Sequence, residues 1–375
     1  RRRAGHQGIW LSGLIGGWSG AHARMVIAGR PGSINAWPMH VLVIGAGLTG
    51  LACARRLTDL GHTVTVIDKG RGVGGRLATR RLGDAAFDTG AQFMTARDPA
   101  FAAEIIAAGA TIWSDGFPEL GGAVLNPDGH ARYVMPGGMN RLAKHLAQGL
   151  QILDQRTVIA VREATASCAS ASARLASRSG ISVRNQSVML SGLSSSRSSW
   201  LMSYLRMDRP CLCLLLDFPE AASALLEAPG GFKITDDPAI TWIASQRAKG
   251  VRLALNDGRG DGLVIHTSGA WSSVRYALTE TQILDQLMPA ALAILNRCGI
   301  THIPARAELK KWKYSLPTIT VPESCVVLDT RLPLILAGDA FGNRPRVEGA
   351  WCSGIAAALT LDRMPLQHGG HNRNS

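Results

Sequence analysis

The most regular hydrophobic pattern of the chain lies between Met39 and Arg76. A short apolar run, His40–Ile44, is typical of a buried parallel strand. A second apolar run, Thr63–Ile67, predicts another strand of the same kind. Between the two runs, apolar residues recur at helical spacing before Gly61, which ends the predicted helix; they are Leu51, Ala54, Leu57 and Leu60. The pattern therefore predicts a β-α-β unit.

The turn between the first strand and the helix carries the spacing G-x-G-x-x-G, with glycines at Gly45, Gly47 and Gly50. The first glycine permits a tight turn, the second lets the backbone approach a pyrophosphate, and the third lets the helix pack closely on the strand. Asp68 ends the second strand, where a carboxylate binds a ribose hydroxyl. We interpret the unit as a dinucleotide-binding fold, because all of these parts occur in the required order.

A second glycine pair, Gly74 and Gly75, follows Asp68 and Lys69 and stands next to Arg76. Such a pair suits a cofactor whose pyrophosphate is enclosed from two sides. The stretch resembles the extended FAD fingerprint of the flavin amine oxidase superfamily rather than that of a simple NAD dehydrogenase. A solvated basic loop is the alternative for the arginines here.

The text DKGRGVGGRLATRR followed by FDTGAQFMTARDP resembles the bacterial renalase-like branch of the FAD-dependent amine oxidase superfamily. The resemblance implies that Gln92 and Phe93 lie near the isoalloxazine ring of FAD. The text YVMPGGMNRLAKHLAQGL resembles the family's P-x-G-M-N element, with an amphipathic helix over Met139–Leu150. The next predicted strand, Gln151–Val161, would bring Val158 near the adenosine.

A second strong resemblance lies at Leu334–Gly354, where a buried strand is expected to end at Gly338 and Asp339. In the superfamily this Asp approaches the ribityl and pyrophosphate region, and the next helix points its N-terminus at the flavin N1–C2=O edge, as a helix that stabilises anions would. We expect the amides of Gly349 and Ala350 to face the flavin O2. Glu348, in the first helical turn, is expected to accept backbone N–H bonds as a cap rather than to transfer protons.

Between these resemblances, an antiparallel sheet covered by helices is expected. The predicted strands are Cys211–Phe218, Ile240–Ser245 and Leu263–Ser268, and the predicted helix is Thr279–Cys298. One face of that helix carries Ile283, Leu287, Ala291 and Leu295. Lys310–Pro317 resembles the family's W-x-Y-[AS]-x-P element, which implies that Trp312 and Tyr314 line the pocket. An edge strand with solvated lysines is an equal alternative. His266 alternates in a strand and is interpreted as a core histidine rather than a catalytic base.

Two stretches do not fit this pattern. Residues 1–38 show no hydrophobic period, and we expect a disordered or non-native extension before a natural start at Met39; an export signal is the alternative. Residues 164–200 are dominated by Ser, Ala and Arg and contain no acid, which suggests a Ser-rich linker or a frame-shifted segment.

The net charge of +13 does not by itself indicate a nucleic-acid partner. Nine of these charges are arginines in the two anomalous stretches, so the remainder carries only +4. The seven cysteines lack disulfide or metal-ligand spacing, which predicts reduced thiols, no metal and a cytoplasmic protein. No apolar run reaches the roughly 18 residues of a membrane span.

The sequence thus predicts an α/β fold: a Rossmann-like FAD-binding domain with an interleaved α+β substrate domain that carries an antiparallel sheet. The expected FAD-binding domain comprises 39–99, 137–206 and 323–362, and the substrate domain 100–136 and 207–322, with a tail at 363–375. The resemblance implies that non-covalently bound FAD oxidises a dihydronicotinamide isomer of NAD(P)H with oxygen, giving NAD(P)+ and hydrogen peroxide. An amine oxidase or desaturase is an alternative, although only 5% of the residues are aromatic and could build its pocket. A non-catalytic or misfolded product is the other alternative.

Overall fold

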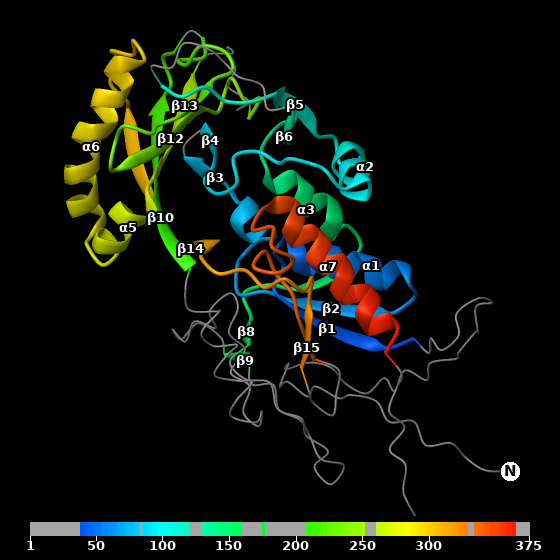
Figure 1. Cartoon of the computed structure of the whole chain (residues 1–375). Coiled ribbons are helices and arrows are strands. Elements are labelled where there is room, and N and C mark those ends of the chain that lie inside the picture. The colour runs from blue at the N-terminus through cyan, green and yellow to red at the C-terminus, as the bar shows by residue number, and fades with distance from the viewer. Residues whose placement is uncertain are drawn as a thin grey trace, which may run out of the picture.

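The computed structural model describes residues 38–82, 85–120, 129–158, 175–176, 208–221, 223–251, 260–328 and 334–364. The expectations for the extension before Met39 and for nearly all of 164–200 lie outside these residues. The described residues form two bodies (Figure 1). One carries the parallel sheet with α1, α3 and α7 packed beside it, and the other carries the antiparallel sheet with α5 and α6.

The first body is the predicted β-α-β unit with its additions. A three-stranded parallel sheet has the order β1-β2-β7, and His40 pairs with Thr63 and Thr65 with Gln151. Its elements are β1 (His40–Ile44), α1 (Leu48–Asp59), β2 (Thr63–Ile67), the short 3-10 helix Gly75–Leu77, α3 (Asn140–Ala147), β7 (Gln151–Leu153) and α7 (Val347–Asp362).

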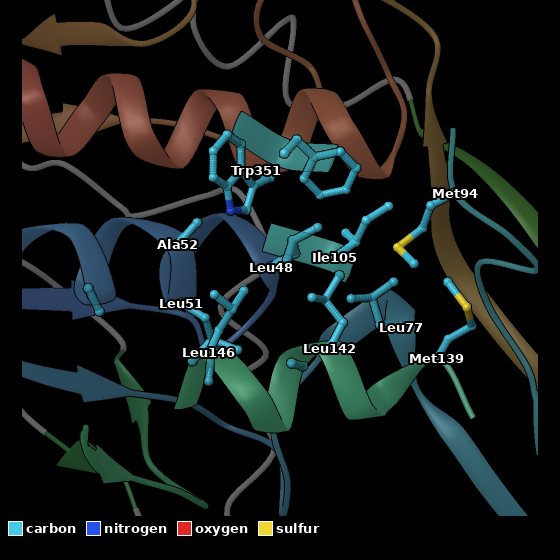
Figure 2. Close-up of a cluster of buried hydrophobic side chains, with 14 of the residues drawn as sticks. Leu48, Leu51, Ala52, Leu77, Met94, Ile105, Met139, Leu142, Leu146 and Trp351 are labelled. Atoms are coloured by element: carbon cyan, nitrogen blue, oxygen red, sulfur yellow. The ribbon is translucent and has the colours of Figure 1, made fainter. Parts of the chain in front are cut away.

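The core of the first body lies between its helices (Figure 2). The apolar face of α1 is buried through Leu51 and Leu57, and α3 contributes Leu142 and Leu146 at the spacing read from the sequence. α7 can approach α1 closely because Gly354 has no side chain: a Cβ there would lie 2.3 Å from the carbonyl oxygen of Thr49. Burial of these apolar faces is the main force that holds the helices on the sheet.

The second body is a five-stranded antiparallel sheet with the order β11-β12-β13-β10-β14. Its elements are β10 (Asp208–Phe218), β11 (Gly231–Lys233), β12 (Ile240–Ser245), β13 (Asp261–Thr267), α5 (Gly269–Arg275), α6 (Glu280–Arg297) and β14 (Arg306–Pro317). A capping box between Thr279 and Gln282 begins α6. Its buried stripe follows the sequence prediction, with Ile283, Leu287, Ala291 and Leu295 packed in one core.

Successive side chains of β10 point to opposite faces of the strand, so β10 packs against both bodies. Leu212, Leu214 and Leu216 pack in the core that includes the buried face of α6, whereas Cys213 and Leu215 pack against Phe87. This follows from the period of two in a strand. Phe87 belongs to the hairpin of β3 (Thr79–Leu82) and β4 (Ala85–Asp88), which leads out of the parallel-sheet body.

The remaining elements are short. They are α2 (Pro99–Ala107), β5 (Thr111–Ser114), β6 (Arg132–Val134), β8 (Thr157–Val158), β9 (Leu175–Ala176), β15 (Val326–Leu328) and β16 (Leu334–Leu336). Of these, β5 pairs antiparallel with β6, and β15 with β16.

Several boundaries differ from the prediction. The strand expected over Gln151–Val161 is broken, because Gln155 adopts φ +52 and the backbone N–H of Arg156 bonds to the carbonyl of Asp68 instead of continuing β7. α1 begins earlier than expected, at Leu48, and α3 ends before Gly149, whose φ is +72. β13 begins two residues before the predicted strand Leu263–Ser268, because Asp261 and Gly262 also pair with β10.

Two strands expected to be buried are only partly so. β1 lies at one end of the strand order, and its Ile44 is 37% exposed. β16 is half-buried and pairs antiparallel with β15, not with the parallel sheet. Side chains of both strands line the cavity described below, which accounts for their exposure.

The packing of α2 differs from the domain boundary expected at residue 100. Its buried residues Phe101 and Ile105 belong to the core of the first body, and the ring of Phe101 lies 5.5 Å from that of Trp351 on α7. Figure 2 shows Ile105 pointing into the same cluster as Leu142 and Leu77. α2 is therefore part of the parallel-sheet body.

Candidate active site

A cavity of about 920 Å³ lies between the two bodies. One wall comes from the glycine turn after β1 and from the ends of β2 and β16, and the other from β10, β13 and β14. Its size is within the range of small-molecule and cofactor sites. The candidate site is therefore shared by the predicted dinucleotide-binding unit and the antiparallel sheet.

Gly50 and Gly47 of the first turn lack a side chain for different physical reasons. A Cβ at Gly50 would lie 1.9 Å from the carbonyl oxygen of Gly45, so the helix could not approach the turn. Gly47, in contrast, has an ordinary extended backbone with φ −75, and a Cβ there would meet nothing within 4 Å. Gly47 faces the cavity, so its missing side chain leaves room for a ligand at the N-terminus of α1.

The second glycine pair lies beside the first turn, as the sequence predicted. The N–H of Gly74 donates to the carbonyl of Ala46 at 2.8 Å, and Gly47 and Gly74 form an isolated parallel bridge. A Cβ on Gly75 would lie 3.5 Å from the Cα of Gly47. Backbone free of side chains thus borders the cavity from two loops, which fits a pyrophosphate held from two sides.

Asp68 is fixed at the carboxyl end of β2. Its Oδ2 accepts from the N–H of Ala46 at 2.7 Å and its Oδ1 from the N–H of Gly70 at 2.6 Å. The carboxylate also lines the cavity, with Lys69 and Val158 nearby in the same lining. This placement fits a carboxylate that receives a ribose hydroxyl through its remaining lone pairs.

Arg76 and Asp339 form an ion pair in the lining of the cavity. Nη1 and Nη2 of Arg76 donate to the two carboxylate oxygens of Asp339, at 2.6 and 2.5 Å. Nη1 also donates to the carbonyl of Ser315 at 3.2 Å. Asp339 and Gly338 follow β16, so the pair joins the second glycine loop to the C-terminal part of the site. Residues that the sequence assigned to one cofactor from two distant motifs are thus brought together.

The wall toward the antiparallel sheet contains Gln92, Phe93, His266 and Trp312. The indole N–H of Trp312 donates to the carbonyl of Thr89 at 2.7 Å, and the Nε2 of Gln92 lies 3.5 Å from that of His266. His266 was expected in the core, but it is partly exposed at the cavity. The alternation of β13 predicted a buried face without showing that the face opens onto a cavity.

A buried ion pair lies behind this wall. Lys249 Nζ is 2.7 Å from Asp88 Oδ2, and both side chains are 0% exposed. Asp88 Oδ1 also accepts from Thr79 Oγ1 at 2.6 Å and from the N–H of Met139 at 2.8 Å. This pair was not predicted from the sequence, because a lysine in the turn after a strand has the same local pattern as a surface lysine.

The pair affects the neighbouring histidine. Burial and the positive charge of Lys249 lower the pKa of His266 to about 4, and a hydrogen bond to the backbone of Thr89 opposes the shift. Burial also lowers the pKa of Lys249, against the attraction of Asp88. His266 is therefore neutral near pH 7.

Comparison with known proteins places this geometry in a known fold. Residues 43–104 match a family model described as an NAD(P)-binding Rossmann-like domain. A structure of cyclohexylamine oxidase from Brevibacterium oxydans is similar over 86% of this chain and 98% of its own, with a TM-score of 0.59 and 14% identity. Putrescine oxidase bound to putrescine is similar over 86% of this chain and 99% of its own, with a TM-score of 0.56 and 13% identity. The chain has the fold of these oxidases.

A curated relative matches a short segment only. The 4,4'-diapophytoene desaturase of Staphylococcus aureus (strain Newman) is 46% identical over 52 residues, which are 14% of this chain and 10% of that enzyme. The match thus covers a small part of the relative's length.

The start of α7 lies at the cavity through Val347 and Ala350, whereas Glu348 points elsewhere. The carboxylate is buried and its Oε1 accepts from the N–H groups of Arg97 and Asp98, both at 2.6 Å. Glu348 therefore caps the chain entering α2 rather than its own helix. Gly349 is not in the cavity lining either; a Cβ there would lie 1.9 Å from the carbonyl oxygen of Arg344.

β14 is an edge strand, as one of the two interpretations of Lys310–Pro317 expected. Trp312 lines the cavity, but Tyr314 is not part of its lining. Lys311 donates to the carbonyl of Tyr276 at 3.1 Å, and so satisfies backbone near the end of α5. The lysines of this strand do not line the cavity.

Four of the aromatic residues form a cluster beside the site. Phe93, Trp113, Phe117 and Trp242 pack together with ring centroids 4.6 to 6.3 Å apart, and Phe93 and Trp242 face the cavity. The sequence argument that few aromatics disfavour an aromatic pocket is therefore wrong, because composition does not show where residues meet.

Within the described ranges, all six cysteines are free, and no group of His, Cys, Asp and Glu has a geometry that would hold a metal ion. In that same part of the chain, no helix is both long and apolar enough to span a membrane.

Proposed function

We propose that the protein is an FAD-dependent oxidoreductase that binds FAD non-covalently. The observation that carries the proposal is the continuity of the cavity. It runs from the paired glycine loops and Asp68 to a wall of Gln92, His266 and Trp312 on the second body. A dinucleotide with a large ring system needs both parts, because its phosphates and its reactive ring are far apart.

The residues fit this cofactor. Gly47 and Gly75 leave backbone accessible for a pyrophosphate, the Asp68 carboxylate at the cavity supports a bond to the adenosine ribose, and the pair Arg76–Asp339 lines the same cavity. The amide of Ala350 at the start of α7 is the remaining candidate for a bond to the ring. Bound FAD would supply a hydride acceptor that oxygen reoxidises.

The substrate in this proposal is a dihydronicotinamide isomer of NAD(P)H, which gives up a hydride and becomes NAD(P)+. The hydride and one proton reduce oxygen to hydrogen peroxide. Such a transfer needs orientation more than a strong base, and the histidine of the site is neutral with a pKa lowered to about 4. The resemblance to renalases, carried by the stretch Asp68–Arg81 and by Phe87–Pro99, supports the choice of substrate.

Anaerobic mixing of the FAD-loaded protein with dihydronicotinamide isomers tests the proposal. We expect bleaching of the flavin absorbance and, when oxygen is admitted, one hydrogen peroxide per substrate oxidised. Flavin that stays oxidised with every isomer would contradict the substrate assignment. Bleaching by amines instead would favour the second candidate.

That second candidate is oxidation of a small amine. The aromatic cluster around Phe93 and Trp242 favours it, because aromatic faces attract cations and exclude water. The fold similarity to cyclohexylamine oxidase and putrescine oxidase supports the fold only, at 14% and 13% identity.

A further inference from the structure

Five Lys and Arg residues line the cavity: Arg76 is paired with Asp339, Arg346 directly precedes α7, and the other three fall into two groups. Lys69 and Arg156 lie at the ends of β2 and β7, where the N–H of Arg156 donates to the carbonyl of Asp68 at 2.8 Å. Arg209 lies on the opposite body, in the first residues of β10. The first group belongs to the adenosine end of the proposed FAD site. Arg209 is not among the residues proposed to hold FAD.

Arg209 is held at the cavity by its neighbours. Its carbonyl accepts from Ser315 Oγ at 2.9 Å, which fixes the backbone next to the irregular register between β10 and β14. Its aliphatic stem passes over Gly269: a Cβ there would lie 3.1 to 3.5 Å from three side-chain carbons of Arg209. Because Gly269 has no side chain, the aliphatic part of Arg209 can pack over its backbone.

The charge of Arg209 is not neutralised by the side chains that the structure describes. The ion pairs of those residues do not include Arg209, whereas Arg76, the other arginine close to Ser315, is paired with Asp339. An exposed guanidinium at a cavity wall presents a fork of N–H donors that matches a phosphate.

We propose that Arg209 binds a phosphate of the dinucleotide substrate, and so selects nucleotides over simple dihydropyridines. This inference rests on the proposed function, because it assigns the substrate a place on the antiparallel-sheet side of the cavity. Ser268 and Ser315 line the cavity beside Arg209, but their hydroxyl groups already donate to the carbonyls of Pro238 and Arg209, so the guanidinium is the donor assigned to the phosphate.

The test compares two substrates in the full-length, FAD-loaded protein. One is the dihydronicotinamide dinucleotide isomer that the native protein oxidises, and the other is a phosphate-free N-alkyl dihydronicotinamide of the same ring isomer. We expect Arg209→Ala to raise KM for the dinucleotide by about tenfold or more, as loss of a charged hydrogen bond does. KM for the phosphate-free compound, flavin content and Tm should stay unchanged.

Three further variants sharpen the test. Arg209→Lys keeps the charge and should recover part of the dinucleotide affinity. Gly269→Val keeps the arginine but fills the room under its stem, so it should raise KM for the dinucleotide in the same direction. Lys313→Ala removes an exposed cation from β14 that does not line the cavity, and should change neither KM.

The outcomes separate the inference from the proposed function. If the native protein oxidises neither compound, the proposed function fails. If it oxidises both and Arg209→Ala leaves the dinucleotide KM unchanged, or raises both KM values equally, the inference is wrong while the function stands. Loss of FAD from Arg209→Ala would place the arginine in the cofactor site and would also overturn the inference.

Discussion

Lys249 and Asp88 form a fully buried pair where the segment after β12 reaches β4. Removal of one partner leaves the other charge buried without compensation, which costs about 3–5 kcal/mol of unfolding free energy. We therefore expect Lys249→Met to be strongly destabilised in urea unfolding. The double variant Lys249→Met with Asp88→Asn should recover part of the loss, because Asn retains an acceptor for Thr79 and Met139. A double variant less stable than Lys249→Met would contradict this account.

His266 predicts a dependence of stability on pH. Its pKa is about 4 in the folded protein and ordinarily 6.5, so the unfolded chain binds the proton more tightly. The neutral ring therefore contributes stability that is fully present above about pH 6.5 and is lost as the pH falls toward about 4. Tm measured across this window should fall further in the native protein than in His266→Gln. Parallel Tm curves for the two proteins would show that the histidine does not titrate in this way.

Glu348 has a structural role in this account. Glu348→Gln keeps one acceptor oxygen for the N–H groups of Arg97 and Asp98 but loses the charge, so unfolding free energy should fall by about 1–3 kcal/mol. Stopped-flow reduction of the bound flavin by a dihydronicotinamide should stay within about tenfold of the native rate, which is 1.4 kcal/mol of barrier. A loss of several orders of magnitude with flavin still bound would make Glu348 catalytic.

At the scale of elements, the turn between β1 and α1 offers a matched pair of variants. Gly47→Val should fold, because φ is −75 and a Cβ meets nothing within 4 Å, but its branched side chain would enter the room left for the pyrophosphate. Gly50→Val should instead lose stability, because its Cβ would lie 1.9 Å from the carbonyl oxygen of Gly45. Circular dichroism and flavin content measured together distinguish the two effects. Normal flavin content in Gly47→Val would refute the fingerprint assignment.

The elements also show which features a sequence can predict. β1, β2 and β12 have the predicted bounds, and the buried stripe of α6 was read correctly, because each is set by a local period and by nearby glycines or caps. The pairing of β16 with β15 was not predicted, because an apolar run does not indicate which strand it will pair with. The packing of α2 against α7 was not predicted for the same reason.

The site was predicted in part for a similar reason. Gly45, Gly47, Gly50 and Asp68 follow one continuous pattern, and the structure places them on one wall of the cavity. Lys249, Arg209 and the aromatic cluster were missed, because their roles arise where the second body meets the first. The neighbouring sequence does not indicate the role of such a residue, because its partner lies far away in the chain.

At the scale of the whole molecule, two bodies enclose the cavity proposed for one cofactor. The antiparallel sheet supplies a wall that the Rossmann-like unit lacks, and the hairpin of β3 and β4 carries Phe87 and Asp88 into contact with it. One cofactor in the shared cavity would contact both the paired glycine loops and the lining residues of the opposite wall.

The absorption spectrum of the purified full-length protein, recorded before and after acid precipitation, tests this claim most directly. We predict flavin absorbance that accompanies the protein through gel filtration and passes into the supernatant on precipitation, where it is identified as FAD. A colourless protein that takes up no FAD from solution, or flavin that remains in the acid pellet, would contradict the account.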